Sequence, residues 1–296
     1  MPRVARELEG VALIRMRKGI FKWNNMNAVG SNLHCLVTLR CTLHIGKAAE
    51  ITRIKKPMES IKTRGLVLKE YEAGESDKRL LLLCKEHGRM MIYARGARKP
   101  KSKFMASAQL FTYSDFVLTA GRGFHALAQA QVIESFYGLR TDYDALTAAH
   151  LVVEVCEKTL LEDTQCDELL LLALKALGYL NKQKLPPLQV ASVFFIRFFA
   201  YYGLAPETQG CTVCGEIADT EMYISAEGLI CRIHKPGYGI RLSQAGVYAL
   251  RHILGRELTG AFLFNARDDV IKELWETSQM LWRCHFDWKL KTTEFI

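Results

Sequence analysis

A change of hydrophobic period near Gly138 constrains the fold of this chain more than any other feature of its sequence. Before Gly138, short runs alternate apolar and polar residues or are apolar throughout, and turns separate them. The five runs are Gly65–Tyr71, Arg79–Lys85, Arg89–Arg95, Phe111–Thr119 and Phe124–Ser135. After Gly138, apolar residues recur at the i, i+3, i+4 spacing of helices. The helical runs are Ala145–Leu161, Asp167–Leu180, Leu188–Tyr202, Ser243–Leu254 and Asp268–Trp288.

These patterns predict an α+β protein with two domains. Five short strands, with no helix long enough for a parallel crossover between them, indicate a small closed barrel, and the five-stranded OB-type β-barrel is the natural candidate. We expect this N-terminal barrel over residues 58–137. An α-helical domain with a zinc-knuckle insertion at residues 211–234 should follow over residues 138–296. The run Leu188–Tyr202 is apolar nearly all round, which predicts a central buried helix.

Residues 1–57 form a basic extension without a sustained period of either kind. They hold 11 Lys and Arg residues against 3 Asp and Glu residues, and so supply most of the net charge of +9. Well-patterned sequence begins only at Met58, so our interpretation is that Met58 is the natural start and that the extension reflects a mis-set start codon. The alternative is a genuine, poorly ordered basic arm. Mass spectrometry of the native protein distinguishes the two, since peptides from residues 1–57 would defeat the first.

Cysteine usage and hydropathy indicate a cytoplasmic protein. The nine cysteines are odd in number and spread through apolar segments, and no secretory signal precedes them, which is typical of a reducing compartment. The longest apolar stretch, Val193–Leu204, is interrupted by Arg197 and is shorter than the roughly 20 residues that a bilayer requires. We therefore expect no membrane interaction.

Two short pairs of soft ligands predict a metal site. Cys211 and Cys214 form the first pair, and Cys231 and His234 form the second after sixteen intervening residues. Each pair offers two ligands from one tight turn, for which Gly215 and Gly228 supply the backbone freedom, and the intervening hairpin brings the two pairs together. Four protein ligands leave no position for a catalytic water, so a structural Zn²⁺ is expected, one per chain. The alternative is that these are reduced core cysteines.

A basic run accompanies the predicted barrel strands. Residues 61–110 hold 12 basic against 5 acidic residues. Basic side chains at a barrel rim can follow a phosphate backbone, and Tyr93, Phe104 or Tyr113 could stack bases, although each is more typical of a core. The alternative is a solvated, lysine-rich loop. The candidate DNA-binding residues are Lys78, Arg79, Arg89, Arg95, Arg98, Lys99, Lys101 and Lys103.

Catalytic motifs are missing from the sequence. It contains no phosphate-binding Gly-x-x-x-x-Gly-Lys loop, no Gly-x-Ser-x-Gly elbow and no His-Glu-x-x-His helix. No His-x-Glu precedes the Cys-x-x-Cys pair as a zinc deaminase would require. These observations favour a binding protein over an enzyme.

Several motifs together resemble the RecO recombination mediator family, and the resemblance covers about residues 58–296. In the predicted barrel they are Thr63–Leu68, Gly74–Leu80, His87–Arg89, Ala94–Arg98 and Lys101–Phe104. In the helical domain, Tyr202–Pro206 leading into Cys211-x-x-Cys214-Gly215 resembles the family's entry into its zinc-bearing insertion. Residues 1–57 have no counterpart in this resemblance.

The resemblance implies a DNA repair protein that binds single- and double-stranded DNA and anneals complementary strands. It implies that the protein, with RecR, helps to load RecA onto DNA coated by the single-stranded-DNA-binding protein, whose C-terminal tail contacts the helical domain. The family's zinc ligands are often four cysteines, whereas His234 holds the fourth position here.

Three other functions are compatible with the same residues. The chain could be an RNA-binding or ribosome-associated OB-fold protein, which competition between single-stranded DNA and structured RNA would reveal. It could be a zinc hydrolase that uses three of the four ligands, or an interaction scaffold whose basic charge is incidental.

Overall fold

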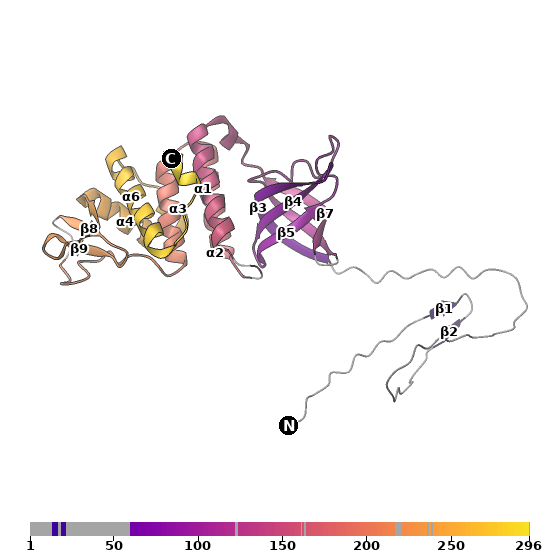
Figure 1. Ribbon diagram of the computed structural model, residues 1–296, viewed down its shortest axis with the longest axis horizontal. Coiled ribbons are helices and arrows are strands. Elements are labelled where there is room, and N and C mark those ends of the chain that lie inside the picture. Colours follow the sequence, from indigo (N-terminus) through magenta and orange to yellow (C-terminus); the bar gives the residue numbers. More distant parts are fainter. Residues whose placement is uncertain are drawn as a thin grey trace, which may run out of the picture. The chain divides into compact units, whose positions relative to one another are not determined.

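The computed structural model describes residues 14–16, 19–21 and 60–295, except 122–123, 161, 163, 217–220, 236 and 238 (Figure 1). The chain divides into two compact units, Met1–Ile54 and Lys55–Ile296. In the first unit, β1 (Ile14–Met16) and β2 (Gly19–Phe21) pair as an antiparallel hairpin, which the sequence did not predict. The rest of the predicted basic extension lies outside the described residues.

Five strands form a closed barrel in the order β3-β4-β5-β7-β6, which confirms the predicted fold. The long strand β3 pairs with β4 through its second half and with β6 through its first half, and a bulge separates Val67 from Lys69. A short parallel pairing between β5 and β7 completes the barrel. The strands are β3 (Ser60–Ala73), β4 (Asp77–Cys84), β5 (Gly88–Ala94), β6 (Tyr113–Ala120) and β7 (His125–Glu134).

The leucine run of β4 has both faces covered. Leu80 and Leu82 fill the barrel interior, whereas Leu81 and Leu83 belong to the core of the helical region. This explains why β4 reads as a continuous apolar run rather than an alternating one. The Cys166 N–H, just before the second helix, donates to the Lys85 carbonyl oxygen over 3.2 Å, so the barrel and the helices pack against each other directly.

All five predicted helices are present with shifted ends. Asp142 begins the first by accepting a hydrogen bond from the Ala145 N–H over 3.0 Å, which is typical of an N-cap. The last ends at His285 rather than Trp288, because Phe286 adopts an extended conformation. The helices are α1 (Tyr143–Thr159), α2 (Asp167–Lys182), α3 (Pro187–Tyr201), α4 (Gln244–Gly255), the short α5 (Leu258–Ala261) and α6 (Asp268–His285).

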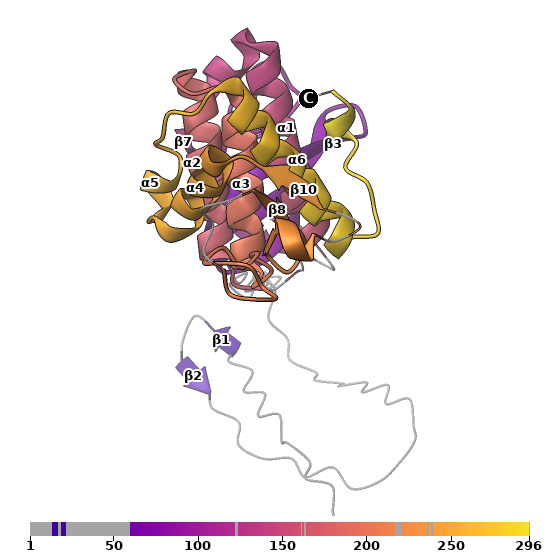
Figure 2. The same cartoon turned by 90° about the vertical axis from the view of Figure 1, so that its left-hand side faces the viewer.

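Helix α3 is the central helix of this region, as predicted, and contacts α1, α2, α4 and α6 (Figure 2). Its four phenylalanines are fully buried, and the ring of Phe195 meets Trp275 and Trp282 edge to face at 5.8 and 5.6 Å. Pro187 occupies its first turn, and Gly203, with a φ of +71°, follows its last. No helix in the described part of the chain is long and apolar enough to cross a membrane.

Between α3 and α4 the chain forms a small three-stranded sheet in the order β10-β8-β9. Buried residues of this sheet, including Met222 and Leu229, join the helical core. The hairpin β8–β9 lies within residues 211–234, which we call the metal insertion. The strands are β8 (Met222–Ile224), β9 (Leu229–Cys231) and β10 (Ile240–Leu242).

Candidate metal centre and nucleic-acid interface

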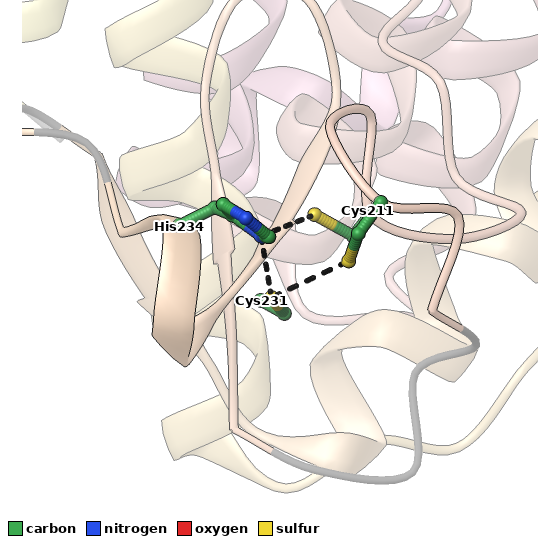
Figure 3. Close-up of side chains that lie close together, drawn as sticks. Cys211, Cys231 and His234 are labelled. Atoms are coloured by element: carbon green, nitrogen blue, oxygen red, sulfur yellow. Dashed lines mark hydrogen bonds between the residues drawn. The ribbon is translucent and has the colours of Figure 1, made fainter.

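Cys211, Cys214, Cys231 and His234 converge, and one ligand atom from each lies within 4.8 Å of the others. Figure 3 shows Cys211, Cys231 and His234 pointing toward one another. The Sγ atoms of Cys214 and Cys231 are 3.8 Å apart, and the His234 Nδ1 is 3.3 Å from the Cys231 Sγ and 3.9 Å from the Cys211 Sγ. Zinc–sulfur bonds of about 2.3 Å imply sulfur–sulfur separations of about 3.8 Å in a tetrahedron. The cluster could therefore hold a metal ion, and its donor set fits zinc.

The backbone around the first ligand pair turns tightly at two glycines. Gly215 has a φ of +76° and donates its N–H to the Cys211 carbonyl oxygen over 2.8 Å. A Cβ on Gly210 would lie 2.8 Å from the Glu216 carbonyl oxygen, so a larger residue does not fit there. The sequence indicated the role of Gly215 but not that of Gly210, because the close approach at Gly210 comes from a residue across the turn.

The second pair is presented by the end of the hairpin. Cys231 is the last residue of β9, and a single 3₁₀ turn over Arg232–His234 returns His234 to the same point. Gly228 has a φ of +152°, and a Cβ on it would lie 2.5 Å from the Glu207 carbonyl oxygen, so only glycine permits this approach.

Backbone amides favour the thiolate form of Cys211. Burial raises the pKa of this thiol, but the backbone N–H groups of Cys231, Cys214 and Val213 act in the opposite direction and hold its pKa at about 6. The thiolate is the form of cysteine that binds metal ions. The insertion therefore favours the metal-binding form of Cys211 even when no ion is bound.

Most of the predicted DNA-binding residues gather at one end of the barrel. Lys78 and Arg79 begin β4, where they pair with Ala94 and Tyr93 at the end of β5. The segment Arg95–Lys103, which we call the basic loop, continues directly from β5. It contains Arg95, Arg98, Lys99, Lys101 and Lys103, and all five side chains are exposed.

Asp77 holds the start of the basic loop against the β3–β4 turn. Its Oδ1 accepts a hydrogen bond from the Gly96 N–H over 2.7 Å, and the Arg98 N–H donates to the Ser76 carbonyl oxygen over 2.9 Å. Gly96 has a φ of +68°, which permits the turn that these bonds fix. The sequence did not reveal this role of Asp77, because the partner lies on a different turn.

The basic residues differ in their partners. Lys78 pairs with Glu70, and Arg98 pairs with Glu72 at 3.1 Å and donates to the Gly74 carbonyl oxygen. Lys103 donates to the Ala128 carbonyl oxygen and lies over the Phe104 ring. Of the eight predicted DNA-binding residues, five have no carboxylate partner in the described part of the chain, and four of these make no side-chain hydrogen bond there either, so they are available to a phosphate backbone. They are Arg79, Arg95, Lys99 and Lys101.

Arg89 does not join this group. It pairs with Leu83, at the other end of β4 from Lys78. Its guanidinium contacts the Glu157 carbonyl oxygen at 3.4 Å and the Glu162 carboxylate at 3.8 Å. Of the candidate stacking aromatics, Phe104 is buried in the barrel core and Tyr113 packs against the helical core.

The Asp77→Ala variant is expected to loosen the basic loop without unfolding the barrel. The Gly96 N–H and the nearby charges of Arg95 and Lys99 lower the pKa of Asp77 below its ordinary value of 3.8. The interaction is therefore fully present above pH 3.8 and is lost as the pH falls through the lowered pKa. Hydrogen exchange of the Gly96 amide at neutral pH should accelerate in Asp77→Ala and stay unchanged in Asp115→Ala, a barrel control. Equal protection of Gly96 in the wild type and Asp77→Ala would show that the carboxylate does not hold the loop.

Two family models match the chain over nearly the whole of residues 58–294. The model described as recombination protein O N terminal matches residues 58–136, and the one described as recombination protein O C terminal matches residues 140–294. The first therefore covers the barrel, and the second covers the helices and the metal insertion.

Curated relatives agree with the family models. The chain is 32% identical over 243 residues to the DNA repair protein RecO of Acetivibrio thermocellus, a match that covers 81% of this chain and 97% of the relative. It is 31% identical over 202 residues to DNA repair protein RecO of Alkaliphilus metalliredigens, covering 67% of this chain and 82% of the relative. The matched residues include the barrel, the helical region and the metal insertion, in the order of the chain. The chain belongs to the RecO family of DNA repair and recombination proteins.

Proposed function

We propose that this chain binds single- and double-stranded DNA and anneals complementary strands. The DNA would bind at the end of the barrel that carries Lys78, Arg79 and the basic loop, which we call the loop end. We further propose that, with RecR, it helps to load RecA onto DNA coated by the single-stranded-DNA-binding protein. The observation that carries the proposal is the gathering of unpaired cations from the start of β4 and the basic loop. A member of this family is a recombination mediator rather than an enzyme, so binding alone has to account for the activity.

Annealing requires no bond chemistry. Two complementary strands repel each other through their phosphates, and cations that neutralise both backbones remove that barrier and release condensed counterions. Arg79, Arg95, Lys99 and Lys101 suit this role because none of them forms an ion pair or a side-chain hydrogen bond among the described residues. Phosphate contacts carry no sequence information, which suits a protein that acts on any broken DNA.

The metal insertion supports a structural role for one Zn²⁺ per chain. Four protein ligands would complete a tetrahedral ion, and two of them, Cys211 and Cys231, are buried. Bound there, the ion would link the two turns of the insertion and so stabilise the neighbouring helical core.

The remaining expectations rest on the family. We assign residues 58–137 to the DNA-binding barrel and 138–296 to the helical domain that carries the partner contacts. The partners would be RecR and the C-terminal tail of the single-stranded-DNA-binding protein, with RecA engaged indirectly. A cytoplasmic, nucleoid-associated location follows from these partners.

The purified full chain is expected to accelerate annealing of complementary oligonucleotides, with a strong dependence on salt. Because each neutralised phosphate contributes roughly 0.9 to the slope, four free cations predict a slope of about −4 for log affinity against log salt on duplex DNA. Fluorescence anisotropy across a salt series measures the slope, and annealing with and without RecR measures the activity. A flat salt response, or preferential binding of structured RNA in competition, would contradict the proposal.

A further inference from the structure

A row of aromatic and arginine side chains crosses the barrel beside the basic loop. Tyr71 on β3 lies directly opposite Arg79 on β4, and Arg79 lies directly opposite Tyr93 on β5. Directly opposed residues of neighbouring strands project from the same face of a sheet, so the three side chains share one face of the barrel. The Arg79 guanidinium lies 5.8 Å from the centre of the Tyr71 ring.

Phe124 extends this row at the β6–β7 turn. Its ring centre is 5.8 Å from that of Tyr93, and 41% of the residue is exposed. Gly121 leaves room for the ring: its N–H donates to the Phe124 carbonyl oxygen over 2.7 Å, and a Cβ there would lie only 3.0 Å from a ring carbon. Phe124 thus packs against the Tyr93 ring and the Gly121 backbone but leaves much of its own ring open to solvent.

We propose that Arg79, Tyr93 and Phe124 bind the unpaired bases of single-stranded DNA by stacking and give this chain a preference for single strands. The inference rests on the proposed function, because it adds base contacts to a surface already proposed to hold phosphates. Stacking on aromatic rings tolerates any base, since every base has a flat π-face. In a duplex those faces are already covered by neighbouring base pairs.

Charge around the row favours a polyanion over an apolar peptide. Arg95 follows Tyr93 by two residues, and Lys99 lies close enough to act on Asp77 together with Arg95. The nearby carboxylates are engaged: Glu70 pairs with Lys78, Glu72 pairs with Arg98, and Asp77 accepts from the Gly96 N–H. Of the four nearby carboxylates, Glu75, on the exposed β3–β4 turn, has neither an ion pair nor a side-chain hydrogen bond in the described part of the chain.

The position of the row also fits an oligonucleotide. In five-stranded OB barrels, the face of the second and third strands and the loops after the first and fourth strands bind extended nucleic acids. Counted from β3, those strands are β4 and β5. The helices cover this face of β4 at Leu81 and Leu83, so Arg79 lies at its open end, with Tyr93 beside it on β5. The loop after the fourth strand carries Phe124. The row would therefore contact the bases of one strand, and the basic loop would contact its phosphates.

The double variant Tyr93→Leu with Phe124→Leu is expected to bind a short oligothymidylate at least about tenfold more weakly and duplex DNA with wild-type affinity. Leucine preserves an apolar contact between the two positions but removes both rings. Tyr93→Phe should behave like the wild type, since it keeps the ring. An oligonucleotide carrying 2-aminopurine should lose fluorescence on binding the wild type, because stacking quenches this base, and should not do so with the double variant.

Tyr248→Leu supplies the matched control, because Tyr248 is an exposed aromatic on α4, 58% accessible. Equal single-strand affinity of the wild type and the double variant would overturn the inference, and so would an equal loss on single strands and duplex. In both cases the wild type would still bind DNA, and the proposed function would stand. Failure of the wild type to bind either form would instead refute the proposed function along with the inference.

Discussion

Replacing Cys231 with alanine is expected to unfold the metal insertion and to lower the free energy of unfolding by about 3 kcal/mol or more. Cys231 is buried at the end of β9, and the ligand pairs have no other covalent or ionic link among the described residues. Without the ion, nothing would bridge the turn that carries Cys211 and Cys214 to the turn that carries His234.

The loss should spread beyond the insertion itself. Met222, Ile224 and Leu229 are buried in the helical core, so an unfolded hairpin exposes part of that core. Arg251 on α4 donates to the carbonyl oxygens of Thr208 and Gln209 over 2.6 and 2.7 Å, just before the first ligand pair. Disorder at the pair would therefore weaken the attachment of α4 as well.

Chemical denaturation of Cys231→Ala, with zinc quantified in the same samples, measures this effect. Cys284→Ala is the matched control: Cys284 is an exposed cysteine on α6 outside the cluster, and its loss should leave stability and metal content unchanged. His234→Ala should likewise lose both metal and stability. A stable His234→Ala protein that retains its metal would favour an open, three-ligand site over a structural one.

Reversing Arg95, Lys99 and Lys101 to glutamate is expected to weaken DNA binding by roughly 100-fold or more and to abolish annealing. Each reversal removes a phosphate contact and adds a like charge, so the loop end of the barrel would repel the backbone that it is proposed to hold. All three side chains are exposed and lack a carboxylate partner in the described part of the chain, so the fold should tolerate the change.

Arg98 and Lys78 are left intact in this variant for a structural reason. Arg98 bonds to Glu72 and to the Gly74 carbonyl oxygen, and Lys78 bonds to Glu70 and to the Ala108 carbonyl oxygen over 3.2 Å. Changing either would also disturb the β3–β4 turn. Weaker DNA binding could then come from altered structure as well as from lost charge. Thermal unfolding and zinc content of the triple variant should therefore match the wild type.

Hydrophobic period predicted most of the fold. All five barrel strands and all five long helices lie where the runs placed them, because burial on one face imposes a period of 2 on a strand and 3.6 on a helix. The exception to alternation, the leucine run of β4, is explained by the helices that cover its second face. The hairpin of β8 and β9 was anticipated only as the link between ligand pairs, since strands of three residues carry too short a pattern.

The convergence of the four candidate metal ligands was predictable from the sequence, whereas the geometry of the basic surface was not. Spacing alone brings Cys211 and Cys214 together on one turn, and the pairing of β8 with β9 supplies the second pair. Arg89 and Arg79 look alike in sequence, but the register of β4 against β5 places them at opposite ends of the barrel. The register of two strands depends on contacts between residues that are distant in sequence, so it cannot be predicted from a local pattern of charge.

We attribute the proposed DNA binding to the cations gathered at the loop end of the barrel rather than to the basic charge of the chain as a whole. A second triple variant, Lys182→Glu, Lys184→Glu and Lys272→Glu, has the same net charge as the loop variant but changes exposed lysines of the helical region. The decisive measurement is the Kd of both variants for one single-stranded oligonucleotide at one salt concentration. We predict that the helical variant binds nearly as well as the wild type and the loop variant about 100-fold more weakly. Equal affinities of the two variants would contradict the account.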